Sequence, residues 1–223
     1  MNKFFKLSLL LTALSFLWAC SSQQSLMLSD QKVRIAKINT ELGMAYLSNN
    51  DVEKAKRKFL MALEQAPDLP EAWYSMGYYL EVTGDTDQAK THYLKAIQLA
   101  PKNGEAHNNY GTFLCRIGDY KNGIEQFMLA IKDPQYVQTA AAYENSALCA
   151  LKIPDLKMAM LYFDKALRHD PRLTISLFEL AKLDYHFGYY QEAEMRLNQY
   201  LSYAPATPQS DQLKSQLKLK HER

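Results

Sequence analysis

The three cysteines carry the most reactive side chains of the chain, and their positions limit what chemistry each can do. Cys20 follows an apolar N-terminal run, whereas Cys115 and Cys149 lie 34 residues apart further along the chain. Thiols act as nucleophiles, metal ligands or disulfide partners, depending on their neighbours. The HExxH, GxSxG, Walker and GxGxxG patterns are absent, and the five histidines are scattered without metal-ligand spacing. The sequence therefore predicts no enzymatic activity, no cofactor or metal, and no small-molecule substrate.

Residues 1–19 have the pattern of a secretory signal peptide. Lys3 and Lys6 precede an apolar run over residues 7–18, which is too short to span a bilayer. The end of this segment, Leu-Trp-Ala-Cys at residues 17–20, resembles the lipobox of bacterial lipoproteins. The resemblance implies cleavage before Cys20 and acylation of that cysteine. The alternative is an ordinary signal peptide with an incidental cysteine.

Acylation of Cys20 would anchor the mature chain to a membrane, because several acyl chains together hold a protein effectively permanently. The residue after it is Ser21 and not aspartate. By resemblance to Gram-negative lipoproteins, this implies sorting to the outer membrane, on its periplasmic face. We expect residues 20–35 to be the lipidated cysteine and a flexible tether.

The charge of the mature chain argues against a nucleic-acid partner. The full chain has a formal charge of +2, and removing Lys3 and Lys6 brings it to zero. A neutral domain lacks the basic surface that phosphate backbones require. We therefore expect no nucleic acid among the partners.

A repeat organises the rest of the chain. Pro67, Pro101, Pro171 and Pro205 end similar segments and are separated by 34, 70 and 34 residues. Thirty-four is the length of a tetratricopeptide repeat, and 70 is two repeats plus two residues. The alternative is an ordinary bundle of amphipathic helices, which the shared register disfavours.

The register predicts an all-α fold: a right-handed superhelical solenoid of about five tetratricopeptide repeats with a C-terminal capping helix. In this register, small residues recur where two helices of a repeat cross, and aromatic residues fill the space between hairpins. The predicted repeats cover residues 36–69, 70–103, 104–139, 140–173 and 174–205, followed by the capping helix at 206–223. The two additional residues fall near Tyr136 to Thr139.

The first helix of each repeat lines the concave face in tetratricopeptide proteins, and by this resemblance the sequence predicts a partner groove. Its apolar and aromatic members suit an extended or helical peptide. The predicted groove residues are Met44, Leu47, Tyr74, Tyr78, Glu81, Asn108 and Thr112. The alternative is that residues 26–33 fold back and occupy this groove.

Cys115 and Cys149 both fall on first helices, those of the third and fourth repeats. Neighbouring first helices pack side by side, and an exported chain meets an oxidising compartment. A disulfide between them is therefore expected, although two buried free thiols remain the alternative.

The segment Asn108-Asn109-Tyr110-Gly111-Thr112-Phe113-Leu114-Cys115 and the later Cys149 resemble the PilF/PilW family of type IV pilus biogenesis lipoproteins. The resemblance implies an outer-membrane lipoprotein that binds the pilus secretin, or another pilus-assembly protein, and promotes secretin localisation or multimerisation. A periplasmic scaffold for other envelope-assembly proteins is the alternative.

Overall fold

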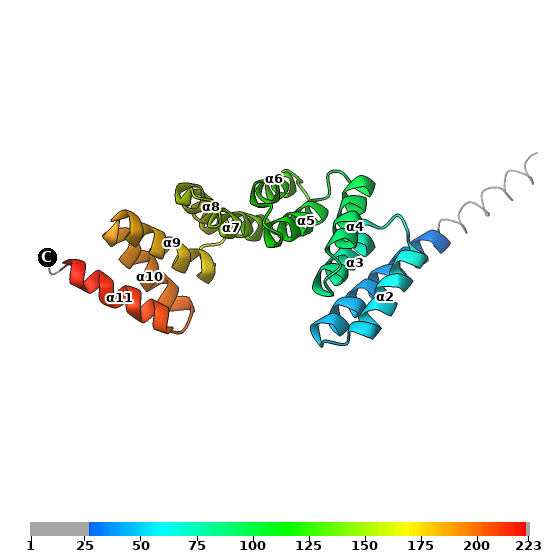
Figure 1. Ribbon diagram of the computed structural model, residues 1–223, viewed down its shortest axis with the longest axis horizontal. Helices are drawn as coiled ribbons and strands as arrows, with labels where there is room; N and C mark the ends of the chain where they lie inside the picture. The colour runs from blue at the N-terminus through cyan, green and yellow to red at the C-terminus, as the bar shows by residue number, and fades with distance from the viewer. Residues whose placement is uncertain (1–26, 222–223) are drawn as a thin grey trace, which may run out of the picture. The chain divides into compact units, whose positions relative to one another are not determined.

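The computed structural model describes residues 27–221, and every regular element within them is helical. Successive helices pair as antiparallel hairpins (Figure 1). An N-terminal helix occupies residues 27–48. It is followed by α2 (Val52–Gln65), α3 (Pro70–Val82), α4 (Thr86–Leu99), α5 (Gly104–Arg116), α6 (Tyr120–Ile131), α7 (Thr139–Ala150), α8 (Leu156–His169), α9 (Thr174–Phe187), α10 (Tyr190–Tyr203) and α11 (Pro208–His221). Each predicted repeat thus contains one pair of helices.

Local sequence explains where these helices turn. Within four of the repeats, the turn between the paired helices holds one residue with positive φ: Asn50, Gly84, Gly118 and Gly188. Glycine adopts this backbone conformation without a Cβ clash, and asparagine tolerates it. The second helix of four repeats ends two residues before a proline, because proline disfavours helix in the residue that precedes it.

Small residues let the two helices of a hairpin approach closely. Ala55, Ala89 and Ala159 on the second helices are fully buried. One turn further along the same helices, large side chains are also buried and fill the space between hairpins: Phe59, Tyr93, Phe127, Phe163 and Leu197. No hairpin buries its apolar surface alone, so each depends on its neighbours.

The chain divides into two compact units, residues 1–99 and residues 100–223. The first contains the N-terminal helix and α2 to α4, and the second contains α5 to α11. In the second unit, α11 lies beside the last hairpin (Figure 1). It covers that hairpin through Leu213 and Leu217, which pack among Leu177, Leu197 and Tyr200. The amide of Ser210 donates to the hydroxyl of Thr207 at 3.2 Å, and the amide of Thr207 donates to the hydroxyl of Ser210 at 2.8 Å. This reciprocal pair caps the start of α11.

The N-terminal helix corrects the expected tether. Residues 27–35, which the sequence analysis assigned to a flexible segment, are helical and continue into the first repeat. They contain no glycine or proline, and Val33 packs against the small-residue core around Ala36 and Ala62. Residues 27–33 therefore do not fold back over the predicted groove. Residues 1–26, including Cys20 and the predicted signal peptide, lie outside the described residues.

One face of the N-terminal helix is open. Ile38 and Leu42 are 55% and 39% exposed. Their counterparts 34 residues later, Ala72 and Met76, are buried, and Ala72 packs with Ala62 of α2 in the preceding hairpin. In the described part of the chain, no helix precedes the first repeat to cover Ile38 and Leu42.

The inserted residues after α6 form a packed corner. Tyr136 is 6% exposed and lies so close to Gly104 that a Cβ there would be 2.6 Å from the Tyr136 Cβ. Asp133 accepts a hydrogen bond from the amide of Gly104 at 2.8 Å. The insertion thereby fastens the loop after α6 to the start of α5.

Candidate binding surface

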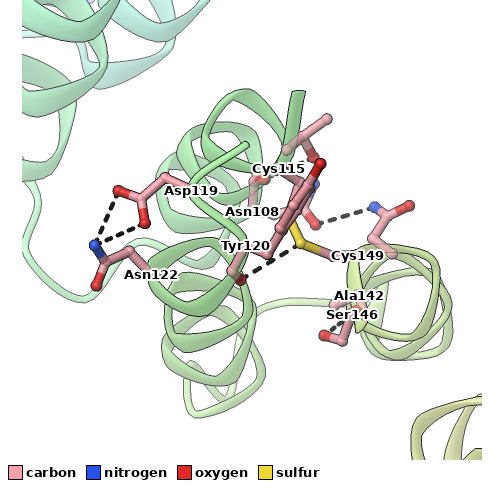
Figure 2. The surroundings of a disulfide bond; sticks show 10 residues. Asn108, Cys115, Asp119, Tyr120, Asn122, Ala142, Ser146 and Cys149 are labelled. Atoms are coloured by element: carbon pink, nitrogen blue, oxygen red, sulfur yellow. Dashed lines mark hydrogen bonds between the residues drawn. A yellow bond between two sulfur atoms is a disulfide. The ribbon is translucent and has the colours of Figure 1, made fainter. Parts of the chain in front are cut away.

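Cys115 and Cys149 form a disulfide between α5 and α7, the first helices of the third and fourth repeats (Figure 2). Their Cα atoms are 5.7 Å apart, within the range that a disulfide spans. Cys149 is 3% exposed, whereas Cys115 is half-buried. The bond joins two hairpins directly, in addition to their packing against each other.

Both sulfur atoms of the disulfide pack closely against residues of α6. A Cβ added at Gly123 would lie 2.5 Å from the sulfur of Cys115. On the other side, the sulfur of Cys149 lies 3.5 Å from the main-chain oxygen of Tyr120 (Figure 2). This is a contact and not a hydrogen bond, because a disulfide sulfur carries no hydrogen.

A hollow of about 390 Å³ opens beside this disulfide, between α5, α6 and α7. Its lining combines apolar and polar groups, with both cysteines contributing to it. The lining residues are Thr112, Cys115, Arg116, Tyr120, Phe127, Asn145, Leu148, Cys149 and Lys152. No carboxylate belongs to this set.

Two amide side chains lie at the junction of α5 and α7. Asn145 donates to the side-chain oxygen of Asn108 at 3.5 Å, a long hydrogen bond (Figure 2). The hydroxyl of Thr112 donates to the main-chain oxygen of Asn108 at 2.9 Å. Both amides are half-buried, so they offer donor and acceptor groups to a bound molecule.

The predicted groove residues divide between the two units. Met44, Leu47, Tyr74, Tyr78 and Glu81 belong to the first unit, where all five are at least partly exposed. Asn108 and Thr112 belong to the second, and Thr112 lines the hollow.

Glu71 and Glu81 both lie on α3, the helix that also carries Tyr74 and Tyr78. Glu81 accepts a hydrogen bond from the hydroxyl of Tyr93 at 2.9 Å, which joins α3 to α4. Burial raises the pKa of Glu71 above its ordinary value, and the nearby carboxylate of Glu41 adds to this while Lys37 opposes it. Of these two carboxylates, Glu81 is therefore tied into the packing of α3 against α4.

The tetratricopeptide register places Leu148 at an inner position of the fourth repeat, whereas sequence reasoning did not select Asn145 or Lys152. A signal was present, because Leu148 is the counterpart of Met44 in the fourth repeat and Lys152 is the counterpart of Arg116. Only the folded arrangement shows that these side chains share a hollow with the disulfide.

An ion pair in the last repeat joins two helices. Asp184 is 2% exposed and accepts a hydrogen bond from Arg196 at 2.5 Å, which joins α9 to α10. Burial raises the pKa of Asp184, and Arg196 opposes that effect. Within residues 27–221, no group of three or more histidine, cysteine or acidic residues is arranged to hold a metal ion.

The helices that the structure describes also lack the combined length and apolar character of a membrane span.

Tetratricopeptide repeat models match residues 70–103 and residues 92–125. The first match covers the same residues as the second predicted repeat. Together with the paired helices, these matches define a protein built of tetratricopeptide repeats. No curated protein sequence matches the chain.

Solved structures with the same fold include two pilus proteins. PilF of Pseudomonas aeruginosa superposes with a TM-score of 0.80 at 24% identity, covering 86% of each chain. PilW, a widely conserved type IV pilus biogenesis factor, superposes with a TM-score of 0.72 at 25% identity, covering 82% of this chain and 84% of its own. YrrB, a tetratricopeptide protein with an unusual peptide-binding site, gives a TM-score of 0.59 at 19% identity, covering 79% of this chain and 90% of its own. The fold of this chain is therefore that of PilF and PilW.

Proposed function

We propose that this protein is a tetratricopeptide scaffold for type IV pilus biogenesis. The observation that carries the proposal is the likeness to PilF and PilW, which extends over more than four fifths of all three chains. A solenoid of helical hairpins works by presenting an extended surface to another protein. The class of partner is therefore a protein, bound through its main chain and a few anchoring side chains.

The finer proposal is an outer-membrane lipoprotein that binds the pilus secretin. Cys20 is its acylation site, and the anchor holds the repeats at the periplasmic face of the outer membrane. The surface around Tyr74 and Tyr78 binds a segment of the secretin and promotes its localisation or multimerisation. Tyrosine suits this role because it adds a large contact area with few rotatable bonds.

Membrane fractionation of a deletion strain tests the role in secretin assembly. We expect secretin multimers to disappear from outer-membrane fractions, and to return when the wild-type gene is supplied. A Cys20→Ala variant should fail to restore them, because the protein loses its anchor. Normal multimers in the deletion strain would refute the secretin role.

Capture of the secretin by the purified protein tests whether the surface around Tyr74 and Tyr78 binds it. Tyr74→Glu combined with Tyr78→Glu should abolish capture, since two charges replace the aromatic contacts. Tyr203→Glu is the matched control, because Tyr203 is 50% exposed and lies at the end of α10. Capture that is unchanged by the double variant would remove the first unit's surface from the proposal.

The alternative function, a scaffold for other envelope-assembly proteins, predicts a different phenotype. A deletion strain would then keep its pili and its secretin multimers. Envelope defects without loss of pili would favour that alternative.

A further inference from the structure

The hollow beside the disulfide has the features of a peptide-binding subsite. We propose that it binds an extended segment of the partner protein, seating one apolar side chain on Leu148 and the disulfide and placing a carboxylate beside Lys152. This proposal rests on the proposed function, because it assigns the chemistry of the segment that the scaffold binds.

Four apolar side chains form the apolar part of the subsite. Leu148, the two half-cystines and Phe127 line the hollow together. A volume of about 390 Å³ accommodates a leucine-sized side chain with its adjoining main chain but is small for a folded element. Burying such a side chain removes its apolar surface from water, which makes it an effective anchor.

The positive charge of the lining determines which group of the ligand lies next to its apolar side chain. Lys152 lies in the turn after α7, and Arg116 ends α5 at the equivalent position of the preceding repeat. Since the lining contains no carboxylate, an acidic group on the ligand complements the charge of Lys152. A lysine ammonium suits a carboxylate as a flexible point charge.

The two amides favour an extended main chain. Asn108 and Asn145 come from neighbouring helices, and their mutual hydrogen bond is long at 3.5 Å. Each asparagine amide has N–H donors and a carbonyl oxygen that accepts, and a peptide group has one donor and one acceptor, so the main chain of a ligand can exchange for this weak contact.

Binding of short blocked peptides to the mature, oxidised protein tests the proposal. The probe is a six-residue peptide of alternating leucine and aspartate, and its comparison peptide carries asparagine in place of aspartate. We expect the acidic peptide to shift the amide resonances of Thr112, Asn145 and Leu148 in nuclear magnetic resonance spectra. The neutral peptide should bind about threefold to fivefold more weakly, as for a solvent-exposed ion pair.

Two variants and one control test which residues contact the peptide. Lys152→Gln should remove the preference for the acidic peptide while the protein stays folded, because Lys152 is exposed. Leu148→Gln should weaken both peptides about tenfold or more, with an unchanged far-ultraviolet circular dichroism spectrum. Lys157→Gln removes an exposed lysine that does not line the hollow and should change nothing.

Several results would overturn the proposal. Equal binding of both peptides would eliminate the carboxylate contact, and shifts confined to other residues would eliminate the site. A dimer of the protein that disappears in Leu148→Gln would identify a second copy of this chain as the occupant.

Secretin capture separates this proposal from the proposed function. If capture occurs and is insensitive to Leu148→Gln and Lys152→Gln, the subsite is wrong while the function stands. If the peptide binds but the secretin is never captured, the subsite stands and the function is wrong.

Discussion

Gly111 of α5 and Gly123 of α6 cross with their backbones in direct contact. A Cβ added at Gly111 would lie 2.9 Å from the main-chain oxygen of Gly123, and one added at Gly123 would lie 3.0 Å from that of Gly111. Because Gly123 also lies against the sulfur of Cys115, this crossing sets the position of α6 relative to the disulfide. The glycine pair therefore lets α6 pack closely against Cys115, one of the residues that line the hollow.

Gly111→Ala should destabilise the protein by about 1–3 kcal/mol, because its Cβ meets main-chain atoms that cannot turn aside. The gain in helix propensity, about 1 kcal/mol, offsets only part of this cost. Thermal unfolding of the oxidised protein measures the difference. Gly77→Ala is the control, since its Cβ would lie 3.3 Å from the Tyr93 ring and should be better tolerated. Equal stability of Gly111→Ala and wild type would contradict the close crossing.

Reduction of the Cys115–Cys149 disulfide should lower the free energy of unfolding. The bond closes a loop of 34 residues, and the chain-entropy model gives a contribution on the order of 3–4 kcal/mol. Urea unfolding with and without a thiol reductant measures this. A variant with serine at both positions should unfold identically in the two conditions. If the reductant lowers the stability of that variant as much, the effect does not come from this bond.

Equivalent leucines in the first and last repeats should respond differently to a polar substitution. Leu42 is 39% exposed, whereas its counterpart Leu180 is 1% exposed. Leu180→Asn should cost about 3 kcal/mol or more, since it leaves a cavity and buries a polar amide. Leu42→Asn should stay within about 0.5 kcal/mol of wild type. A large loss of stability in Leu42→Asn would mean that another part of the chain covers the first repeat.

Arg196→Met should destabilise the last repeat by about 3 kcal/mol at neutral pH, because it leaves the buried carboxylate of Asp184 without its cation. Burial already raises the pKa of Asp184, and losing Arg196 raises it further. A raised folded-state pKa contributes stability that is present below the unfolded value and lost as pH rises through the folded value.

The deficit of Arg196→Met should therefore shrink as the pH falls from 7 toward the ordinary aspartate range. Unfolding by urea across this interval measures it, with Arg172→Met as an exposed-arginine control. A deficit that is independent of pH would mean that the loss comes from packing and not from the charge of Asp184.

The repeat can be predicted from the sequence because the residues that end its helices and form its turns act on their immediate neighbours in the chain. Prolines two residues beyond a helix stop that helix, as at Pro67 and Pro101, and the positive-φ turns at Gly84, Gly118 and Gly188 favour glycine for steric reasons. The same turn in the fourth repeat contains Pro154, whose fixed φ excludes that conformation, and this turn differs from the others. Periodicity of this kind predicts which residues face a neighbouring hairpin.

Other features depend on contacts between segments distant in the sequence. Residues 27–35 continue the N-terminal helix of the chain, and Val33 packs against the core around Ala36 and Ala62. Tyr136 is buried because the inserted loop packs against Gly104. The repeat pattern does not predict this contact, since the insertion is not part of the repeat. Asn145, Leu148 and Lys152 meet the disulfide only because α5, α6 and α7 converge there. The sequence by itself determined the hairpins and their order, since each hairpin follows from local propensity and short-range packing. Only the tertiary structure decided which side chains share a hollow, because that depends on how one hairpin is rotated against the next.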